Sequence, residues 1–194
     1  MPATRRSFVA VAKAAERSLR AAGIDHVFVG ALAVAAFGVP RTTADVDVIA
    51  DYREADAPRM ADAFRRQGFR VSPEDLRDAV AERSHCTVHD TRSEFHLDLA
   101  PATRATAKDA IRHAVRVRWR DIVLPIAGPE HTIVMKLAYG SEQDVADALG
   151  IYVRQRKRLD VHRMREFARR QGVLRAVREL ERKYSNEPPD PRSS

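Results

Sequence analysis

Residues 45–50, Asp-Val-Asp-Val-Ile-Ala, place two acidic side chains at alternate positions of a valine-rich segment. The side chains of a β-strand point alternately to its two faces. Asp45 and Asp47 therefore share one face of the predicted strand, and the valines that follow them share the other. Two carboxylates in a partly buried strand cost free energy unless a cation balances them. The segment thus predicts a strand with an apolar core face and an acidic, cation-binding face.

A second segment with this alternation is residues 93–100, where Asp98 lies opposite the apolar face. If the two strands are neighbours in a sheet, Asp98 joins Asp45 and Asp47. Three carboxylates repel one another unless divalent cations are bound, and oxygen-only ligands suit Mg²⁺ or Mn²⁺. Such ions stabilise the attacking and leaving oxygens of a phosphoryl displacement. The alternative is that these aspartates are ordinary exposed residues of alternating strands.

The segment before the acidic pair predicts a phosphate-binding turn. A short buried strand over residues 26–30 ends at Gly30, and a helix begins at once and ends near Gly38. Glycine lets the backbone approach a phosphate closely, and a helix N-terminus presents free N–H groups to it. Arg41 and Thr43 are predicted to hold triphosphate oxygens. The alternative is a tight turn followed by a loop arginine.

Strand and helix patterns mix along the chain up to about Ile126, and every later segment is helix-like. This order predicts an α+β fold, a mixed β-sheet with packed helices, followed by a C-terminal helical appendage. We expect an α/β core over residues 1–128, a helical region over 129–184 and a disordered tail over 185–194. Further strands are expected over residues 69–71, 86–90, 115–119 and 121–127, and helices over 31–38, 56–67, 73–83, 104–113, 129–140, 142–155, 160–172 and 173–184, with a first helix that Gly23 ends.

The formal net charge of +7 is confined to the end of the chain. Residues 1–150 contain 21 Lys and Arg and 21 Asp and Glu, whereas residues 151–194 contain 13 and 6, so 13 − 6 = +7. Such asymmetry favours a polyanionic partner, nucleic acid first, and the alternative is a solvated helix face. The predicted nucleic-acid contacts are Arg154, Arg156, Lys157 and Arg158.

Other features of the sequence bear on where in the cell the protein is found. No run approaches the eighteen or so apolar residues that a membrane span requires. Lys13, Glu16 and Arg17 interrupt the N-terminal segment, so we interpret it as an amphipathic helix and not as a signal peptide. The one cysteine, Cys86, excludes an internal disulfide. We therefore expect a cytoplasmic protein with no membrane partner.

The order strand, Gly30, small residue, helix, then R-x-T-x-D-x-D, then a third aspartate on a later strand resembles the nucleotidyltransferase fold of the polymerase-beta superfamily. Within it, residues 27–48 are most similar to small bacterial and archaeal nucleotidyltransferase-like proteins related to AbiEii and MenT toxins. Residues 129–149, with a lysine in a helix followed by an aspartate at the next helix start, also resemble that group.

The resemblance implies a role for each matching residue. Gly30 and Ala31 match the phosphate turn. Asp45 and Asp47 match the metal-binding pair, and Asp98 matches the third carboxylate, which helps to activate the attacking hydroxyl. Lys136 matches a lysine that contacts the nucleotide phosphates, and Asp144 matches the acidic residue after it. Asp147 is interpreted as an acid favoured near a helix start.

These matches imply a metal-dependent nucleotidyltransferase that transfers a nucleotide from an NTP such as ATP to a hydroxyl acceptor. The expected acceptor is RNA, for example tRNA, and a toxin role would imply an antitoxin protein as partner. The alternative is a catalytically inactive protein of this fold that binds nucleic acid or a protein. Ala31 favours that alternative, because many active members have Ser or Gly there. Metal-dependent NTP binding distinguishes the two.

Overall fold

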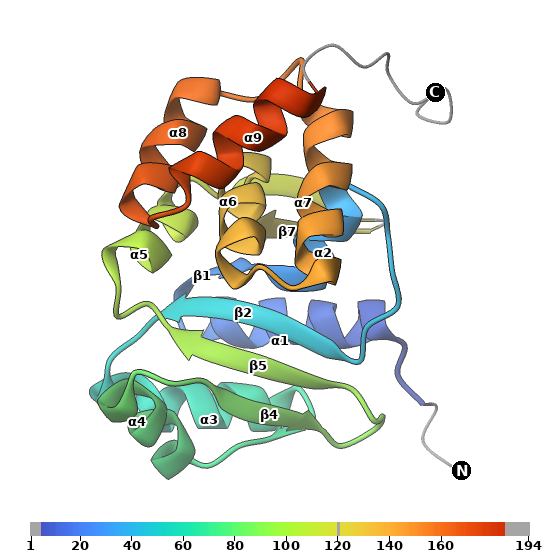
Figure 1. Ribbon diagram of the computed structural model, residues 1–194. Coiled ribbons are helices and arrows are strands. Elements are labelled where there is room, and N and C mark those ends of the chain that lie inside the picture. The colour runs from blue at the N-terminus through green and yellow to red at the C-terminus, as the bar shows by residue number, and fades with distance from the viewer. Residues whose placement is uncertain (1–4, 120, 185–194) are drawn as a thin grey trace. The chain divides into compact units, whose positions relative to one another are not determined.

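The computed structural model describes residues 5–119 and 121–184 (Figure 1). The predicted tail over 185–194 lies outside these residues. Within them, seven strands form one mixed sheet in the order β3-β4-β5-β2-β1-β7-β6. The strands are β1 (Asp25–Phe28), β2 (Asp45–Asp51), β3 (Phe69–Arg70), β4 (Cys86–Asp90), β5 (His96–Pro101), β6 (Val115–Trp119) and β7 (Ile122–Ile126).

The chain divides into two compact units. The sheet unit contains the described residues up to Leu32 and Thr42–Ile126; the helical unit contains Ala33–Arg41 and the described residues from Ala127 on. The predicted domain boundary after residue 128 stays a prediction. The helices are α1 (Phe8–Ala21), α2 (Gly30–Phe37), α3 (Ala57–Arg66), α4 (Pro73–Glu82), α5 (Ala105–Arg112), α6 (Pro129–Tyr139), α7 (Glu142–Gln155), α8 (Val161–Arg170) and α9 (Leu174–Tyr184), with a 3₁₀ turn at Glu54–Asp56.

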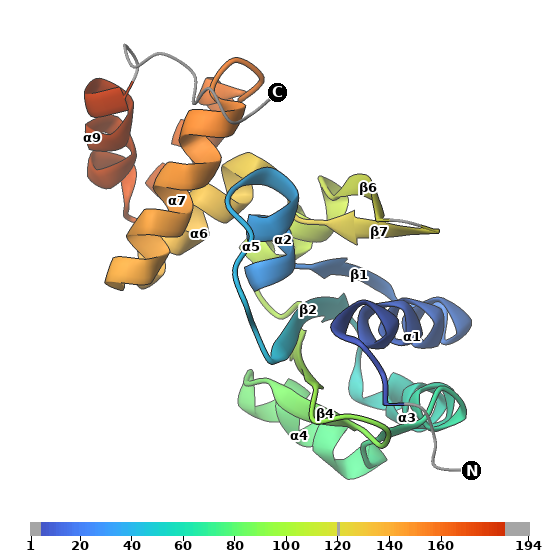
Figure 2. The same cartoon turned by 90° about the vertical axis from the view of Figure 1, so that its right-hand side faces the viewer.

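Strand β2 lies inside the sheet, antiparallel to β1 and parallel to β5. Its alternation is the predicted one: Val46 and Val48 are fully buried, and the aspartates beside them are half-buried. Helices α1 and α3 contact each other, and Figure 2 shows them on one side of the strands. The apolar face of β2 therefore belongs to the core of the sheet unit, and the acidic face lies on the other side.

The helical unit has a hydrophobic core of its own, built from α6, α7, α8 and α9 together with Val34 of α2. The loop after α2 packs closely on α7, because a Cβ added at Gly38 would lie only 2.7 Å from Ile151 Cγ1. Gln155 Nε2 donates to the carbonyl oxygen of Phe37 at 3.0 Å. These contacts join residues 33–41 to helices that lie more than a hundred positions later in the chain.

The predicted fold class, an α+β mixed sheet followed by helices, is confirmed. One strand starts later than predicted: β5 begins at His96 and not at residue 93. The Asp90 carboxylate accepts hydrogen bonds from Ser93 Oγ at 2.6 Å and from the Arg92 backbone N–H at 3.3 Å, which holds the chain in a turn. Among the described helices, none is long and apolar enough to cross a membrane.

Candidate active site

Asp45, Asp47 and Asp98 come together on the sheet unit as predicted. Each offers one carboxylate oxygen, and these oxygens lie within 4.8 Å of one another. The parallel pairing of β2 with β5 causes this, because it sets Asp47 directly opposite Asp98. All three residues are half-buried. Three like charges this close favour a bound cation, and the group could hold a divalent metal ion.

The Gly30 turn lies against this group. Gly30 has φ +58°, and a Cβ added to it would lie 1.9 Å from Asp47 Oδ2. The Val29 backbone N–H donates to the Asp47 carbonyl at 3.0 Å, which ties the end of β1 to β2. The space that the glycine leaves open is therefore filled by a carboxylate. Ala31 is buried in the first turn of α2. A phosphate contact of Gly30 and Ala31 stays a prediction.

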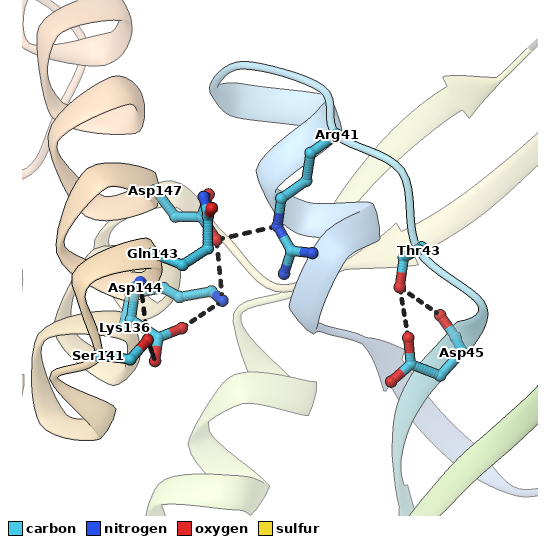
Figure 3. Close-up of polar contacts among 8 residues, drawn as sticks. All are labelled: Arg41, Thr43, Asp45, Lys136, Ser141, Gln143, Asp144 and Asp147. Atoms are coloured by element: carbon cyan, nitrogen blue, oxygen red, sulfur yellow. Dashed lines mark hydrogen bonds and ion pairs between the residues drawn. The ribbon is translucent and has the colours of Figure 1, made fainter.

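Two threonine hydroxyls contact the outer carboxylates. Thr43 Oγ1 donates to the Asp45 carboxylate and lies 3.4 Å from its carbonyl oxygen (Figure 3). Thr87 Oγ1 of β4 donates to Asp98 Oδ1 at 3.3 Å. The sequence interpretation missed Thr87, because only the pairing of β4 with β5 sets it opposite Asp98. For Thr43, the structure gives a carboxylate contact, and its predicted triphosphate contact stays a prediction.

In the helical unit, Lys136 is almost fully buried and is paired with two acids (Figure 3). Its Nζ lies 2.7 Å from Asp144 Oδ1 and 3.0 Å from Asp147 Oδ2. Arg41 Nε lies 3.3 Å from the same Asp147 oxygen. Asp147 is therefore a buried partner of two cations and more than a helix-start acid. Its spacing of three residues from Asp144 on α7 is the signal in the sequence for a shared face.

These contacts determine the charge states of Lys136 and Asp144. Burial, the largest single influence, lowers the pKa of Lys136, but the hydrogen bonds and charges of Asp144 and Asp147 outweigh it, so this pKa is raised. Burial likewise raises the pKa of Asp144, and hydrogen bonds from Lys136 and Ser141 outweigh it, so that pKa is lowered. Both groups are thus held in their charged forms. The predicted phosphate contacts of Arg41, Lys136 and Asp144 stay predictions.

The basic residues near the end of α7 line a hollow of about 550 Å³ within the helical unit. Phe37 and Pro40 contribute to its wall. Arg156 is half-buried, and its Nη1 donates to the Tyr184 carbonyl at 3.4 Å. The basic lining residues are Arg154, Arg156, Lys157 and Arg158. Their role in nucleic-acid binding stays a prediction.

No family model matches this chain, and a comparison with curated proteins finds no match. Among the solved structures that are similar to it are two of the same protein. One is a solution structure of the antibiotic-resistance factor ANT(2'')-Ia, with 14% identity over 91% of this chain and 99% of that chain and a TM-score of 0.53. The other is a crystal structure of ANT(2'')-Ia in complex with adenylyl-2''-tobramycin, with 16% identity over 90% and 98% and a TM-score of 0.50.

At these identities the likeness shows the fold alone. The chain has a fold similar to that of a nucleotidyltransferase, as its motifs predicted. The narrower resemblance to AbiEii and MenT toxins is not confirmed.

Proposed function

We propose that this protein is a metal-dependent nucleotidyltransferase that transfers a nucleotide from an NTP, with ATP as the first candidate, to a hydroxyl group. The observation that carries the proposal is the set of three carboxylate oxygens within 4.8 Å on adjacent strands, beside the Gly30 turn. The fold, similar to that of a nucleotidyltransferase, supports it. The exclusive use of oxygen ligands favours Mg²⁺ or Mn²⁺.

In this mechanism Asp45, Asp47 and Asp98 would hold the metal, and Asp98 accepts the proton of the acceptor hydroxyl. Divalent ions, when bound, neutralise the phosphate oxygens and the developing charge. Gly30 and Ala31 bind phosphate through backbone N–H groups at the start of α2. The acceptor oxygen forms a bond to the α-phosphorus while the bond to the β-phosphate oxygen breaks. Pyrophosphate leaves with that electron pair.

Arg41 and Lys136 would neutralise the triphosphate. Arg41 contacts Asp147 through Nε, and Lys136 contacts both Asp144 and Asp147. A guanidinium group has five N–H donors and an ammonium group has three, so each side chain can bind a phosphate oxygen in addition to its carboxylates or in exchange for one of them. In this proposal the Thr43 hydroxyl also contacts the triphosphate, and Asp144 keeps Lys136 charged and oriented in the empty protein.

Two acceptor classes follow from different observations. The basic hollow at the end of α7 supports RNA, such as tRNA, as the acceptor. The toxin role and an antitoxin partner belong to this proposal only through the resemblance of the sequence motifs. A separate hollow of about 620 Å³ in the sheet unit supports a hydroxyl-bearing cation. Its lining includes Thr87 and the three acids Asp75, Asp78 and Glu82, which outnumber the one arginine there, Arg70. ANT(2'')-Ia, bound to adenylyl-2''-tobramycin in one similar structure, suggests an amino sugar of this kind.

The test is incubation with each labelled NTP and Mg²⁺, in parallel with total RNA and with a panel of aminoglycosides. We expect labelled product that requires the divalent ion. Replacing Asp45 and Asp47 together by Asn should abolish Mg²⁺-dependent NTP binding and leave the fold intact, because the change relieves like-charge repulsion. Asp62→Asn, at an exposed acid of α3, is the control. A double variant that binds Mg²⁺–NTP as tightly as the natural protein would place the site elsewhere.

Substitution of Asp98 tests whether the protein catalyses transfer or only binds the nucleotide. Asp98→Asn removes a basic lone pair and a charge but keeps the size of the side chain. We expect Mg²⁺–NTP binding to change by only a few-fold, because Asp45, Asp47 and the triphosphate itself still hold the ion, whereas binding of an ion alone depends more strongly on Asp98. Transfer should fall about a hundredfold or more, the usual scale for loss of a general base. Equal turnover in the variant and the natural protein would remove Asp98 from the mechanism. The absence of metal-dependent NTP binding would favour the inactive protein that binds nucleic acid or a protein.

A further inference from the structure

Thr87, Asp98 and Asp47 form a row across three adjacent strands of the sheet unit. Asp98 of β5 is paired with Asp47 of β2 on one side and with Thr87 of β4 on the other. In an antiparallel pair such as β4 and β5, side chains directly opposite each other have their Cβ atoms about 4.5–5.5 Å apart. The Thr87 hydroxyl uses this proximity and donates to Asp98 Oδ1 at 3.3 Å. His96 Nε2 lies 3.9 Å from the same oxygen.

We propose that Thr87 is a positioning residue for the third metal-binding carboxylate. The inference rests on the proposed function, because it assigns Asp98 to a metal. The last torsion of an aspartate has a broad energy well, so a carboxylate without a fixed donor rotates easily. Repulsion from the two other carboxylates would turn Asp98 away from them. The Thr87 hydroxyl fixes Oδ1, disperses part of its charge and leaves Oδ2 to bind the cation.

Asp45, another of the three carboxylates, also has a threonine donor. Thr43 donates its hydroxyl to the Asp45 carboxylate, so each outer carboxylate has a threonine donor. Hydrogen bonds from such outer groups orient metal ligands, and their removal typically costs 10- to 100-fold in metal affinity. Thr43 lies two residues before its partner, whereas Thr87 reaches Asp98 from another strand. The contact of Thr87 with Asp98 therefore depends on how the strands pair, whereas the contact of Thr43 with Asp45 is local in the sequence.

The register of β4 on β5 determines that contact. Val88, the neighbour of Thr87, is fully buried opposite the equally buried Leu97. A slip of one residue would move Val88 to the half-exposed face and Thr87 into the core, so the apolar packing holds the hydroxyl in place. Thr87 itself is only half-buried. Its hydroxyl contributes little to the core, and its removal should leave the fold intact.

The test measures binding of Mn²⁺ alone to the whole protein, from the paramagnetic resonance signal of the free ion. Thr87→Val keeps the shape and β-branching of the side chain but removes the donor, and we expect affinity to fall about tenfold or more. Thr87→Ser keeps the hydroxyl and should stay within about threefold of the natural protein. Thr91 lies in the turn after β4, and its hydroxyl donates to the Gly68 carbonyl. Thr91→Val removes this hydroxyl and should leave the Mn²⁺ affinity unchanged.

Thermal melting without metal checks that each variant is folded. Unchanged Mn²⁺ affinity in Thr87→Val would overturn the inference and leave the proposed function standing. A loss in Thr87→Ser as large as that in Thr87→Val would also overturn it, because the effect would then come from packing and not from the hydroxyl. A natural protein that binds no Mn²⁺ would overturn the proposed function and this inference together.

Discussion

At the scale of single residues, Gly30 has the strongest steric requirement in the candidate site. Gly30→Ala would force an L side chain into the left-handed region and bring its Cβ to 1.9 Å from Asp47 Oδ2. We expect the variant to lose about 1–2 kcal/mol of unfolding free energy, the cost of that backbone conformation. We also expect Mn²⁺ affinity to fall about tenfold or more, because Asp47 must move. Chemical denaturation and a Mn²⁺ titration measure the two effects.

Gly23→Ala is the matched control, because Gly23 has φ +60° and an added Cβ would meet only the flexible end of Arg59. It should lose a similar unfolding free energy and keep the Mn²⁺ affinity of the natural protein. If Gly30→Ala binds Mn²⁺ normally, Asp47 is not a metal ligand in its present position.

The lowered pKa of Asp144 predicts a pH dependence of stability. A carboxylate whose pKa is lower in the folded than in the unfolded protein stabilises the fold above its usual pKa of about 4. That contribution is lost as the pH falls through the lowered value. Asp144→Asn should therefore cost about 2 kcal/mol at pH 7, and the difference from the natural protein should shrink below about pH 4. Urea unfolding at several pH values measures it, and a difference that persists unchanged at pH 3 would contradict it.

At the scale of elements, the loop that follows α2 packs on α7, and this contact predicts different effects for two glycine substitutions. Gly38→Ala would place a Cβ 2.7 Å from Ile151 Cγ1 and 3.2 Å from the Ile151 backbone nitrogen. We expect a loss of about 1–3 kcal/mol from overpacking. Gly150→Ala, inside α7, meets the exposed Val39 side chain at 3.4 Å and should be neutral or stabilising, since alanine favours helices. Equal effects in urea unfolding would mean that the loop does not pack on α7 as described.

At the scale of the whole molecule, the charge of the last 44 residues predicts salt-dependent RNA binding. Each phosphate neutralised on single-stranded RNA contributes about −0.7 to the slope of log affinity against log salt. Replacing the four basic residues of the α7 hollow by Gln should reduce that slope by up to about 3 and leave NTP binding unchanged. The control replaces four exposed arginines of the sheet unit, Arg20, Arg65, Arg66 and Arg70.

Filter binding over a range of salt concentrations measures this slope. If the control variant loses as much of the slope as the α7 variant, RNA binding depends on total charge and not on the hollow. If the natural protein binds no RNA at low salt, these residues form a solvated helix face.

Local pattern was enough to predict most elements of the fold. Alternation placed β2 within a residue of its observed end, and a helix-like segment predicted α7 with its observed bounds. Ser141, whose hydroxyl accepts from the Asp144 N–H at 3.1 Å, explains why α7 begins where it does. Such signals act over a few residues, through backbone hydrogen bonds and the period of the side chains, and a sequence displays them directly.

The site was predictable only in part. Asp45 and Asp47 share a face because of their spacing, and Asp98 joined them once two alternating strands were taken as neighbours. The contacts of Thr87 with Asp98 and of Asp147 with Lys136 were not visible in this way. They depend on which strands pair, in which register, and on how helices pack. Those choices are made by burying apolar side chains distant in the chain, so only the tertiary structure decides which polar groups meet.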